Sequence, residues 1–199
     1  MAAPPIQPVQ ALQVLPPVFV SFSAEIVPKT AEVLLATMAK LVNDGYKTVH
    51  LLLSTPGGSV MHGVTVYNVL RGLPITLITH NVGNVDSIGS VVFLAGEQRY
   101  ACPQTTFMLH GVSFTPGGQA QFFERNLNER LNALRADQQR IAAIYNDRAR
   151  ITPQMAEQYF IQETTVSAAE AMGLGIVHEL RQVTIPEGSP IFQLIFDRK

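Results

Sequence analysis

Short apolar runs alternate with longer stretches of helical spacing through the first half of the chain, and few folds accommodate this pattern. Thr48–Leu53 and Ile75–Thr79 are apolar and rich in β-branched residues, as expected of buried strands. A helix is expected between them, over about Val60–Leu70. An earlier strand at Val18–Phe22 and a helix over Pro28–Asp44 repeat the pattern. Strands separated by helices predict an α/β fold with a mainly parallel sheet.

The second half of the chain contains one unusually long polar helix. Apolar residues at helical spacing extend from Gln119 to about Arg150. At about 1.5 Å per residue, such a helix is too long for one face of a domain of this size. We therefore expect it to project and to pack on another subunit, unless a break divides it into two shorter helices.

Shorter elements are expected on both sides of this helix. Strands are predicted at Gln98–Cys102, Thr105–Leu109 and Gly175–Leu180, and the tail Ile191–Phe196 either adds an edge strand or packs on a neighbour. Thr152-Pro153 has the pattern of a helix start. The capping box Ser167-Ala-Ala-Glu170 opens a further helix that ends with Gly173 as C-cap.

Length and composition indicate one domain with a full-sized core. We expect a Pro-rich arm over residues 1–17, the domain itself over residues 18–180 and a tail over residues 181–199. Hydrophobic residues make up 47% of the chain and charged residues 15%. That composition suits a sheet covered on both faces, with some apolar surface left for subunit contacts.

Charge and residue usage argue against several classes of function. The net charge is −1 with no basic cluster, so nucleic acid is not expected as a partner. No apolar run reaches the ~18 residues needed to cross a bilayer, and no secretory signal is evident, so no membrane partner is expected. The single Cys102 indicates a reducing compartment, which we expect to be cytoplasmic. The five histidines lack metal-ligand spacing, so we expect neither a metal nor a cofactor.

The stretch Asn84–Ser90 lies between an apolar strand run and a second apolar run, Val91–Ala95. Asp86 or Ser87 would serve as the N-cap of a buried helix here. A serine at such a turn lies beside unpaired backbone N–H groups and the positive end of the helix dipole, which suits an oxyanion. Taken alone, Ser87 has the simpler interpretation of an N-cap.

Three other segments carry groups that would complement a reactive serine. Gly57 and Gly58 follow a buried strand, where open α/β sheets place ligands and a backbone N–H can point outward. His110 ends an apolar strand, and Glu163 is expected in a loop. Each alone reads more simply as a tight turn, a strand-end histidine or a solvated carboxylate. Acyl transfer needs a nucleophile, a base and an orienting carboxylate, and with Ser87 these segments contain that set.

Five motifs in one order then make a family resemblance specific. They are Ser54–Val60, Ser87–Gly89, Met108–His110, Gly117–Ala120 and Ser167–Ala171 with Gly173–Val177. Each is weak alone, but together they resemble the proteolytic subunit family of the Clp protease, ClpP, over about residues 18–180. The resemblance implies a serine endopeptidase with the ClpP/crotonase-like stack of ββα units. It also implies that the long helix is a projecting handle through which two rings meet.

Carried over residue by residue, the resemblance puts the nucleophile at Ser87, the general base at His110 and the third triad member at Glu163. The backbone N–H groups of Gly58 and Ile88 would form the oxyanion hole.

The resemblance also implies how substrate and partners are bound. Gly57, Gly117 and Gly118 would help to hold an extended peptide as an added strand. The implied substrate is a peptide or an unfolded protein. The implied partners are further copies in a homo-oligomeric ring, with an ATP-dependent unfoldase or a second ClpP-type subunit.

The chain departs from the family pattern at several positions. Glu163 stands where the family usually has Asp, and Asp86 stands where a small residue is usual, so either carboxylate could orient His110. Ile88 replaces a common Met, which matters little if only its N–H acts. The Pro-rich arm does not resemble the usual axial segment and leaves docking of an unfoldase open.

Rival interpretations give other roles to the same fold. A serine–lysine peptidase would need one of Lys29, Lys40 or Lys47 near Ser87, because no lysine lies between Ser87 and the tail. A crotonase-type acyl-CoA enzyme would use the backbone N–H groups but would not need Ser87 and His110 together. A catalytically decayed ring subunit would keep the fold and lose the activity.

Overall fold

The computed structural model describes residues 15–114 and 123–196. Its strands are β1 (Val18–Ser23), β2 (Thr48–Thr55), β3 (Thr76–Asp86), β4 (Gln98–Ala101), β5 (Thr106–Leu109), β6 (Thr164–Ser167), β7 (Glu179–Leu180) and β8 (Ile191–Gln193). Its helices are α1 (Pro28–Asn43), α2 (Val60–Gly72), α3 (Ile88–Phe93), α4 (Glu124–Arg148), α5 (Pro153–Gln162) and α6 (Ala168–Gly173).

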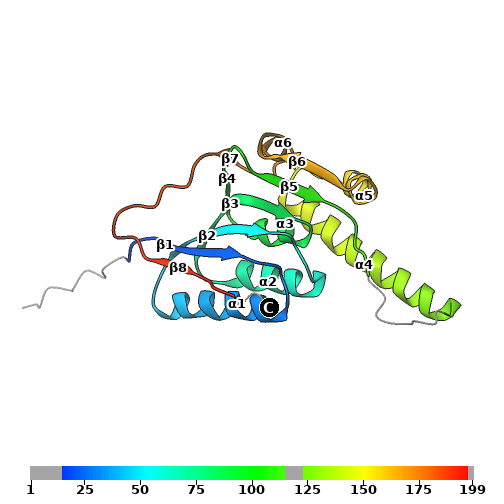
Figure 1. Ribbon diagram of the computed structural model, residues 1–199, viewed down its shortest axis with the longest axis horizontal. Coiled ribbons are helices and arrows are strands. Elements are labelled where there is room, and N and C mark those ends of the chain that lie inside the picture. The colour runs from blue at the N-terminus through cyan, green and yellow to red at the C-terminus, as the bar shows by residue number, and fades with distance from the viewer. Residues whose placement is uncertain (1–14, 115–122, 197–199) are drawn as a thin grey trace, which may run out of the picture.

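The strands form one sheet in the order β6-β5-β3-β2-β1-β8, with β4 paired to β3 and β7 paired to β4 (Figure 1). All of these pairs are parallel except the antiparallel pair β5–β6. Parallel neighbours need a crossover connection, which α1 supplies between β1 and β2 and α2 between β2 and β3. The predicted α/β fold with a mainly parallel sheet is confirmed.

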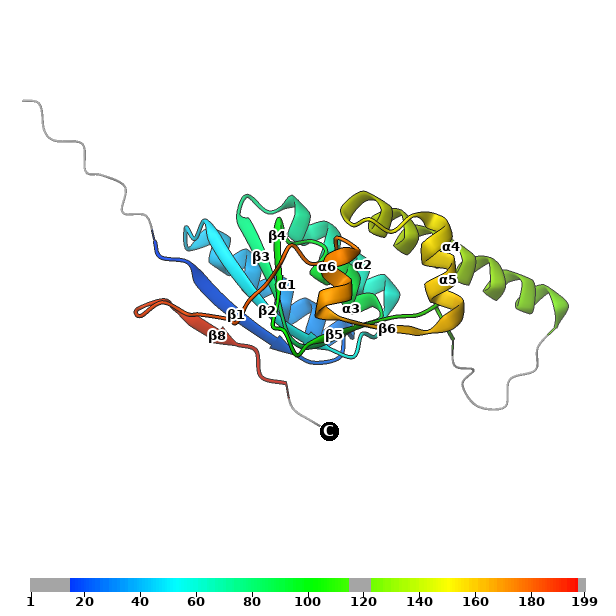
Figure 2. The same cartoon turned by 90° about the horizontal axis from the view of Figure 1, so that it is seen from above.

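Helices α1 and α2 cover one face of the sheet. They lie beneath the strands in Figure 1 and behind them in Figure 2. In β2, Val49, Leu51 and Leu53 are fully buried, each worth about 1.5–3 kcal/mol of transfer free energy. Their neighbours His50 and Leu52 point to the opposite face and are only half-buried. Because α1 and α2 lie on the same face, coverage of the opposite face stays a prediction for the single chain.

Strand β3 is longer than the sequence indicated, since it continues past Thr79 to Asp86. A bulge shifts its register against β2. The buried side chain of Asn81 supports the bulge: its Nδ2 donates to the Thr106 carbonyl at 2.8 Å, and its Oδ1 accepts from the Gly83 N–H at 3.1 Å. Asparagine and glycine are typical of turns, so the pattern ended the strand too early.

Helix starts in the second half were predicted well. The Thr152 side chain accepts from the Met155 N–H at 3.3 Å before α5. The capping box of α6 is present, with the Ser167 N–H donating to the Glu170 carboxylate at 2.7 Å and the Ser167 hydroxyl accepting from the Glu170 N–H at 3.3 Å. Such local hydrogen bonds depend on sequence spacing alone, which is why the pattern predicts them.

Other boundaries in this region differ from the prediction. Gly173 is the last helical residue of α6, and Leu174 takes the C-cap position. The strand expected over Gly175–Leu180 is reduced to β7, because the N–H groups of Ile176 and Val177 donate to the Ala171 carbonyl and turn the chain onto α6. Strand β6, antiparallel to β5, was not predicted.

The tail takes one of its two expected roles. Its strand β8 pairs in parallel with β1, with Phe192 opposite Val20. Residues 1–14 of the expected arm lie outside the described part of the chain. The division into arm, domain and tail at residues 17 and 180 stays a prediction.

Helix α4 is a single helix of 25 residues, so the alternative of two shorter helices is wrong over this range. Its C-terminal half is packed on the domain, where Ile141, Ala142 and Tyr145 are buried. Its N-terminal half projects beyond the sheet in Figures 1 and 2 and exposes Leu127 (48%) and Leu131 (43%). Exposed leucines on a projecting helix fit the expected contact with another subunit.

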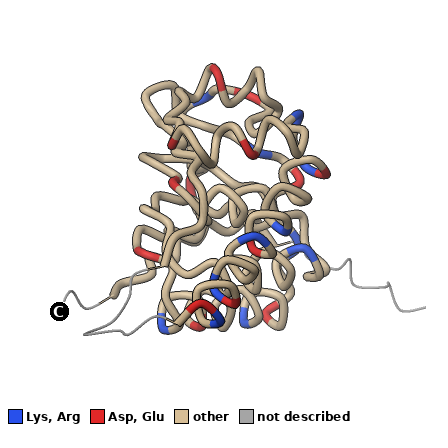
Figure 3. The backbone as a smooth tube through the Cα atoms, turned by 90° about the vertical axis from the view of Figure 1, so that its right-hand side faces the viewer, with Lys and Arg blue, Asp and Glu red and all other residues tan. Residues whose placement is uncertain are grey.

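Charged residues of both signs are interspersed over the backbone, including the end of the molecule that faces the viewer in Figure 3. Within residues 15–114 and 123–196, no helix is long and apolar enough to cross a bilayer. No three His, Cys, Asp or Glu residues of the described chain are grouped so that they could hold a metal ion.

Two histidines are in contact on the less covered face of the sheet. His50 Nδ1 and His80 Nε2 lie 2.9 Å apart, and His80 is only 3% exposed, with its ring also against Tyr100. Burial, the charge of His50 and that of Arg181 lower the pKa of His80 to about 3. Burial and Arg181 also lower the pKa of His50. His80 therefore stays neutral in the folded protein at neutral pH.

We expect the free energy of unfolding to fall as the pH drops below the ordinary histidine pKa of 6.5. The unfolded chain then binds a proton at His80, whereas the folded chain does not until about pH 3, so stability present at pH 7 is lost across that window. For His80 alone the loss is about 2 kcal/mol at pH 5. Urea unfolding at pH 7 and pH 5 measures it. His80→Phe keeps an aromatic ring and should show a smaller loss; an equal loss in both proteins would contradict the assignment.

Candidate active site

Ser87 occupies the turn between β3 and α3 in a strained backbone conformation. Its φ is 55° and its ψ is −131°, a region that residues other than glycine rarely adopt. Its N–H donates to the Met108 carbonyl at 2.7 Å, which extends the pairing of β3 with β5. Ser87 holds the N-cap position of α3, but its side chain makes no capping hydrogen bond. The predicted N-cap position of Ser87 is confirmed, and its hydroxyl is not used for capping.

Gly57, in the turn after β2, packs directly on Ser87. A methyl group at this position would lie 2.6 Å from the Ser87 Cβ and 2.8 Å from the Asp86 carbonyl oxygen. The φ of Gly57 is also +92°, where a side chain is strained whatever the space. Only glycine fits between the two strand ends at this point.

The backbone around Gly58 leaves one N–H group directed away from the sheet. Gly58 forms a parallel bridge with Ile26. The Ile26 N–H donates to the Gly57 carbonyl at 2.7 Å, and the Ser59 N–H donates to the Ile26 carbonyl at 2.8 Å. Because these flanking groups face Ile26, the Gly58 N–H points to the opposite side.

A hollow of about 70 Å³ brings four of the predicted site residues together. Its lining consists of Gly58, Val60, Ser87, Ile88, His110, Gly111, Val112, Ser113, Ile141 and Tyr145. Neither the Gly58 N–H nor the Ile88 N–H has a backbone acceptor among the described residues. Ser87, His110, Gly58 and Ile88 therefore line one small space, and the N–H groups of the two latter residues have no backbone acceptor in the described chain.

His110 is half-buried and directly follows β5. The next residue is fixed, since the Gly111 N–H donates to the Phe160 carbonyl of α5 at 3.1 Å. In the described chain no hydrogen bond joins the side chains of Ser87 and His110. Hydrogen bonds between catalytic groups commonly tighten only when substrate binds.

Glu163 lies beside the His110 backbone but does not line the hollow. The last pair of the antiparallel ladder β5–β6 is Leu109–Thr164, so Glu163 and His110 stand opposite each other one position further on. Glu163 ends α5 with φ 50° and is exposed. Within the described residues its carboxylate makes no hydrogen bond to His110. The structure therefore brings the backbone of Glu163 to His110 and leaves the carboxylate in solvent.

Asp86, the other candidate carboxylate, is already engaged. Its Oδ2 accepts from the Asn84 Nδ2 at 2.5 Å. Asp86 pairs with Met108, two residues before His110. Among the described residues Asp86 forms no hydrogen bond with His110. Gly117 and Gly118, predicted to bind substrate, lie outside the described residues.

Two residues that the sequence pattern did not single out lie behind Ser87. The Ser90 hydroxyl donates to the Ser87 carbonyl at 2.5 Å and lies 2.6 Å from the Tyr145 hydroxyl of α4. Both side chains are almost fully buried. Ser90 stands one helical turn after Ser87, which is a weak signal, and Tyr145 lies on the apolar face of α4.

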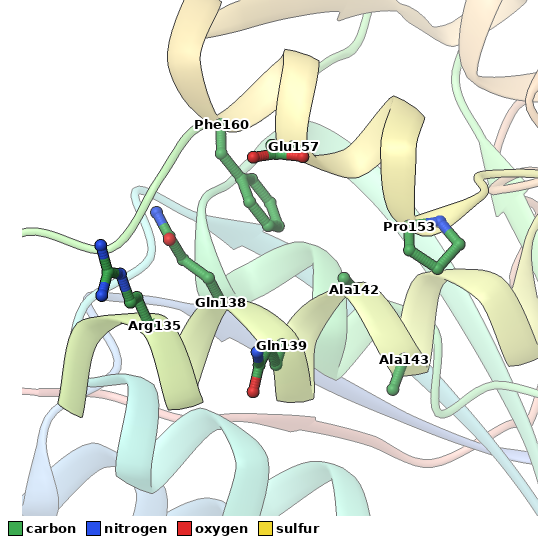
Figure 4. A pocket seen from close by; sticks show the side chains of 8 residues that line it. All are labelled: Arg135, Gln138, Gln139, Ala142, Ala143, Pro153, Glu157 and Phe160. Carbon is green, nitrogen blue, oxygen red and sulfur yellow. The ribbon is translucent and has the colours of Figure 1, made fainter. Parts of the chain in front are cut away.

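Two larger hollows flank the site. One of about 360 Å³ shares Gly58, Val60, Val112 and Ser113 with the Ser87 hollow and extends along α4 to Leu134 and Asp137. The other, of about 430 Å³, lies between α4 and α5, with Arg135 and Gln138 on one wall and Glu157 and Phe160 on the other (Figure 4). The second hollow shares no lining residue with the Ser87 hollow, so the first is the one continuous with the candidate site.

A mainly parallel sheet with a strained serine at the end of its central strand, beside a histidine, defines a protein of the ClpP/crotonase fold class. The family model described as Clp protease matches residues 11–184, and the chain belongs to this family.

Two relatives show the extent of the similarity. The chain is 33% identical over 79 residues to an ATP-dependent Clp protease proteolytic subunit from Bdellovibrio bacteriovorus, a match over 39% of this chain and 37% of that relative's length. The crystal structure of the ClpP protease catalytic domain from Plasmodium falciparum superposes with a TM-score of 0.66 at 20% identity. That match covers 85% of this chain and 88% of the other, and it confirms the predicted fold class.

We expect Gly57→Ala to destabilise the protein by about 1–3 kcal/mol, because the new methyl group meets Ser87 and the positive φ becomes strained. Gly72→Ala is the matched control, since a Cβ there has nothing within 4 Å. It should leave stability unchanged or raise it by up to about 1 kcal/mol. Thermal and urea unfolding of both variants measure the difference, and equal stabilities would show that the Gly57–Ser87 contact is not tight.

Proposed function

We propose that this protein is a serine endopeptidase in which Ser87 is the nucleophile and His110 the general base. The observation that carries the proposal is the strained Ser87 turn, which lines one hollow together with His110, Gly58 and Ile88. Membership of the Clp protease family supports the same reaction. Acyl transfer needs these groups and no metal ligand set.

The proposed reaction assigns a step to each of these groups. His110 accepts the proton of the Ser87 hydroxyl as its oxygen attacks a peptide carbonyl. The N–H groups of Gly58 and Ile88 then stabilise the oxyanion, each worth about 3–4 kcal/mol in comparable sites. His110 gives its proton to the leaving amine, and water hydrolyses the acyl-enzyme by the same steps.

An extended peptide or unfolded protein segment is the proposed substrate. The hollow of about 360 Å³ beside Gly58 has room for a side chain next to the reacting carbonyl. Gly57, Gly117 and Gly118 would contribute main-chain contacts to such a segment, as an added strand does.

The proposed assembly is a homo-oligomeric ring in the cytoplasm. The exposed leucines 127 and 131 of α4 are the apolar surface that a second copy would cover. An ATP-dependent unfoldase or a second ClpP-type subunit is the proposed further partner, in line with the ATP-dependent relative from Bdellovibrio bacteriovorus.

The structure gives less support to a serine–lysine peptidase or an acyl-CoA enzyme. No lysine lines the hollow that Ser87 borders, so a lysine base has no candidate among the described residues. An acyl-CoA enzyme would need the N–H groups alone, whereas Ser87 and His110 border the same space. A decayed subunit would keep the fold but not the reactivity of Ser87, which reaction with a fluorophosphonate probe measures.

We expect a fluorophosphonate probe to form a covalent adduct at Ser87, located by peptide mass spectrometry, and Ser87→Ala to lose it. Ser113→Ala is the matched control, since Ser113 lines the same hollow but is assigned no step of the reaction. It should keep the adduct and the turnover of a fluorogenic peptide. A folded, oligomeric wild-type protein that forms no adduct would contradict the proposed function.

We propose Glu163, whose backbone stands opposite His110, as the third triad member, and expect Glu163→Gln to lower kcat by about two to four orders of magnitude, as when other triads lose the carboxylate that orients histidine. The fold should be unchanged, because Glu163 is exposed. Asp86→Asn is the matched comparison and should stay within about threefold of wild type, because Asn84 already holds the Asp86 carboxylate. Steady-state kinetics of both variants decide: a large loss only in Asp86→Asn would transfer the orienting role to Asp86.

A further inference from the structure

A chain of hydrogen bonds runs from α4 to the backbone of Ser87. The Ser90 hydroxyl donates to the Ser87 carbonyl oxygen at 2.5 Å. The same hydroxyl lies 2.6 Å from the hydroxyl of Tyr145. A serine hydroxyl has one proton, so Ser90 must accept the bond from Tyr145, which is the donor at the start of the chain.

Both hydroxyl groups are removed from solvent. Ser90 is 0% and Tyr145 is 2% exposed. Burial raises the pKa of Tyr145 to about 12, with the Ser90 hydrogen bond acting in the opposite direction. Tyr145 therefore keeps its proton and donates it at every pH at which the protein is handled.

The Ser87 carbonyl has a hydrogen-bond donor besides the Ser90 hydroxyl. It already accepts from the Ser90 backbone N–H at 3.0 Å, as a first helical turn provides. The hydroxyl is thus a second donor to one oxygen. Two donors restrict the rotation of the carbonyl more than one does, and a buried chain of hydrogen bonds strengthens each of its members.

The carbonyl of Ser87 and the N–H of Ile88 belong to one peptide unit. That unit is planar, so its C=O and N–H point in opposite directions and turn together. Fixing the Ser87 carbonyl on the buried side therefore fixes the Ile88 N–H on the side of the hollow, which Ile88 lines. Hydrogen bonds to the carbonyl also make the N–H of the same amide a stronger donor.

We infer that Ser90 and Tyr145 are positioning residues, which orient the Ile88 N–H toward the oxyanion through the peptide unit they hold. The inference rests on the proposed function, in which Ile88 supplies one of the two oxyanion donors. Helix α4, which projects at its N-terminal end (Figure 1), thereby contributes Tyr145 to the support of the active site.

The test compares Ser90→Ala and Tyr145→Phe with the wild-type protein in its native assembly. A misplaced oxyanion donor weakens the transition state and leaves ground-state binding alone. We expect kcat for a fluorogenic peptide to fall by about tenfold or more in Ser90→Ala and by about three- to tenfold in Tyr145→Phe, with KM within twofold of wild type. Phosphonylation by a fluorophosphonate, which also forms a tetrahedral centre, should slow by the same factors.

Thr79→Val is the matched control for a merely structural role. Thr79 is 0% exposed, and its hydroxyl donates to the Phe93 carbonyl at 2.8 Å, at the opposite end of the same helix α3. The variant loses a buried hydroxyl bond to α3 without touching the Ser87 peptide. Thr79→Val should lose stability, as the two test variants do, but its kcat should equal that of the wild-type protein.

The double variant Ser90→Ala/Tyr145→Phe adds a second criterion. Because Tyr145 acts through Ser90, the double variant should lose no more kcat than Ser90→Ala alone. If the fold-losses of kcat in the two single variants instead multiply in the double variant, Tyr145 does not act through Ser90 and the inferred order is overturned. If Ser90→Ala does not fold, Tyr145→Phe carries the test, since it removes one oxygen and keeps the buried ring.

The outcomes separate this inference from the proposed function. A wild-type protein that reacts at Ser87, with both test variants reacting like Thr79→Val, would overturn the positioning role and leave the peptidase assignment intact. A wild-type protein that does not react at Ser87 would overturn both. A fall in kcat at constant KM in the test variants, absent from Thr79→Val, is the result that supports it.

Discussion

The backbone turn at Ser87 has a strained conformation that its neighbours stabilise, and the geometry of the site depends on this turn. A non-glycine residue at φ 55° costs of order 1–3 kcal/mol, so neighbouring groups must impose the conformation. The Met108 carbonyl of β5 accepts from the Ser87 N–H. The N–H and the hydroxyl of Ser90 in α3 both donate to the Ser87 carbonyl, and Gly57 packs directly against the Ser87 side chain. Three separate parts of the chain thus fix one turn and present its hydroxyl at the end of a strand.

The path of β3 explains how the histidine comes to this turn. Residues 78–81 of β3 pair with β4, whereas residues 84–86 pair with β5. The bulge between these segments, held by the buried Asn81, lets one strand change its neighbour. His110 directly follows β5 and therefore arrives beside Ser87, which directly follows β3. A strand that stopped at Thr79 would have left the two residues without a common edge.

The sequence predicted what depends on local spacing and missed what depends on contacts between distant segments. Apolar periodicity located β1, β2, α1 and α2, and capping residues located α5 and α6. The extension of β3 through Asn81 was missed, because a buried amide bonded across strands has the same composition as a turn. Ser90 and Tyr145 are 55 positions apart, and no one-dimensional pattern connects a serine in one helix with a tyrosine in another. The family motifs indicated Ser87 and His110, and their shared hollow is a tertiary feature.

Helix α3 begins at the site and is so short that its position depends on the elements around it. A helix of six residues has too few internal hydrogen bonds to be stable alone, so its position is set by its neighbours. Helix α4 bonds to both ends of it: Tyr145 to Ser90 near the start, and Arg148 to the Leu94 carbonyl at 3.2 Å after the end. The buried Arg99 donates in turn to the Arg148 carbonyl at 2.8 Å. Helix α4 therefore holds α3 at both of its ends, on either side of the site that the Ser87 turn begins.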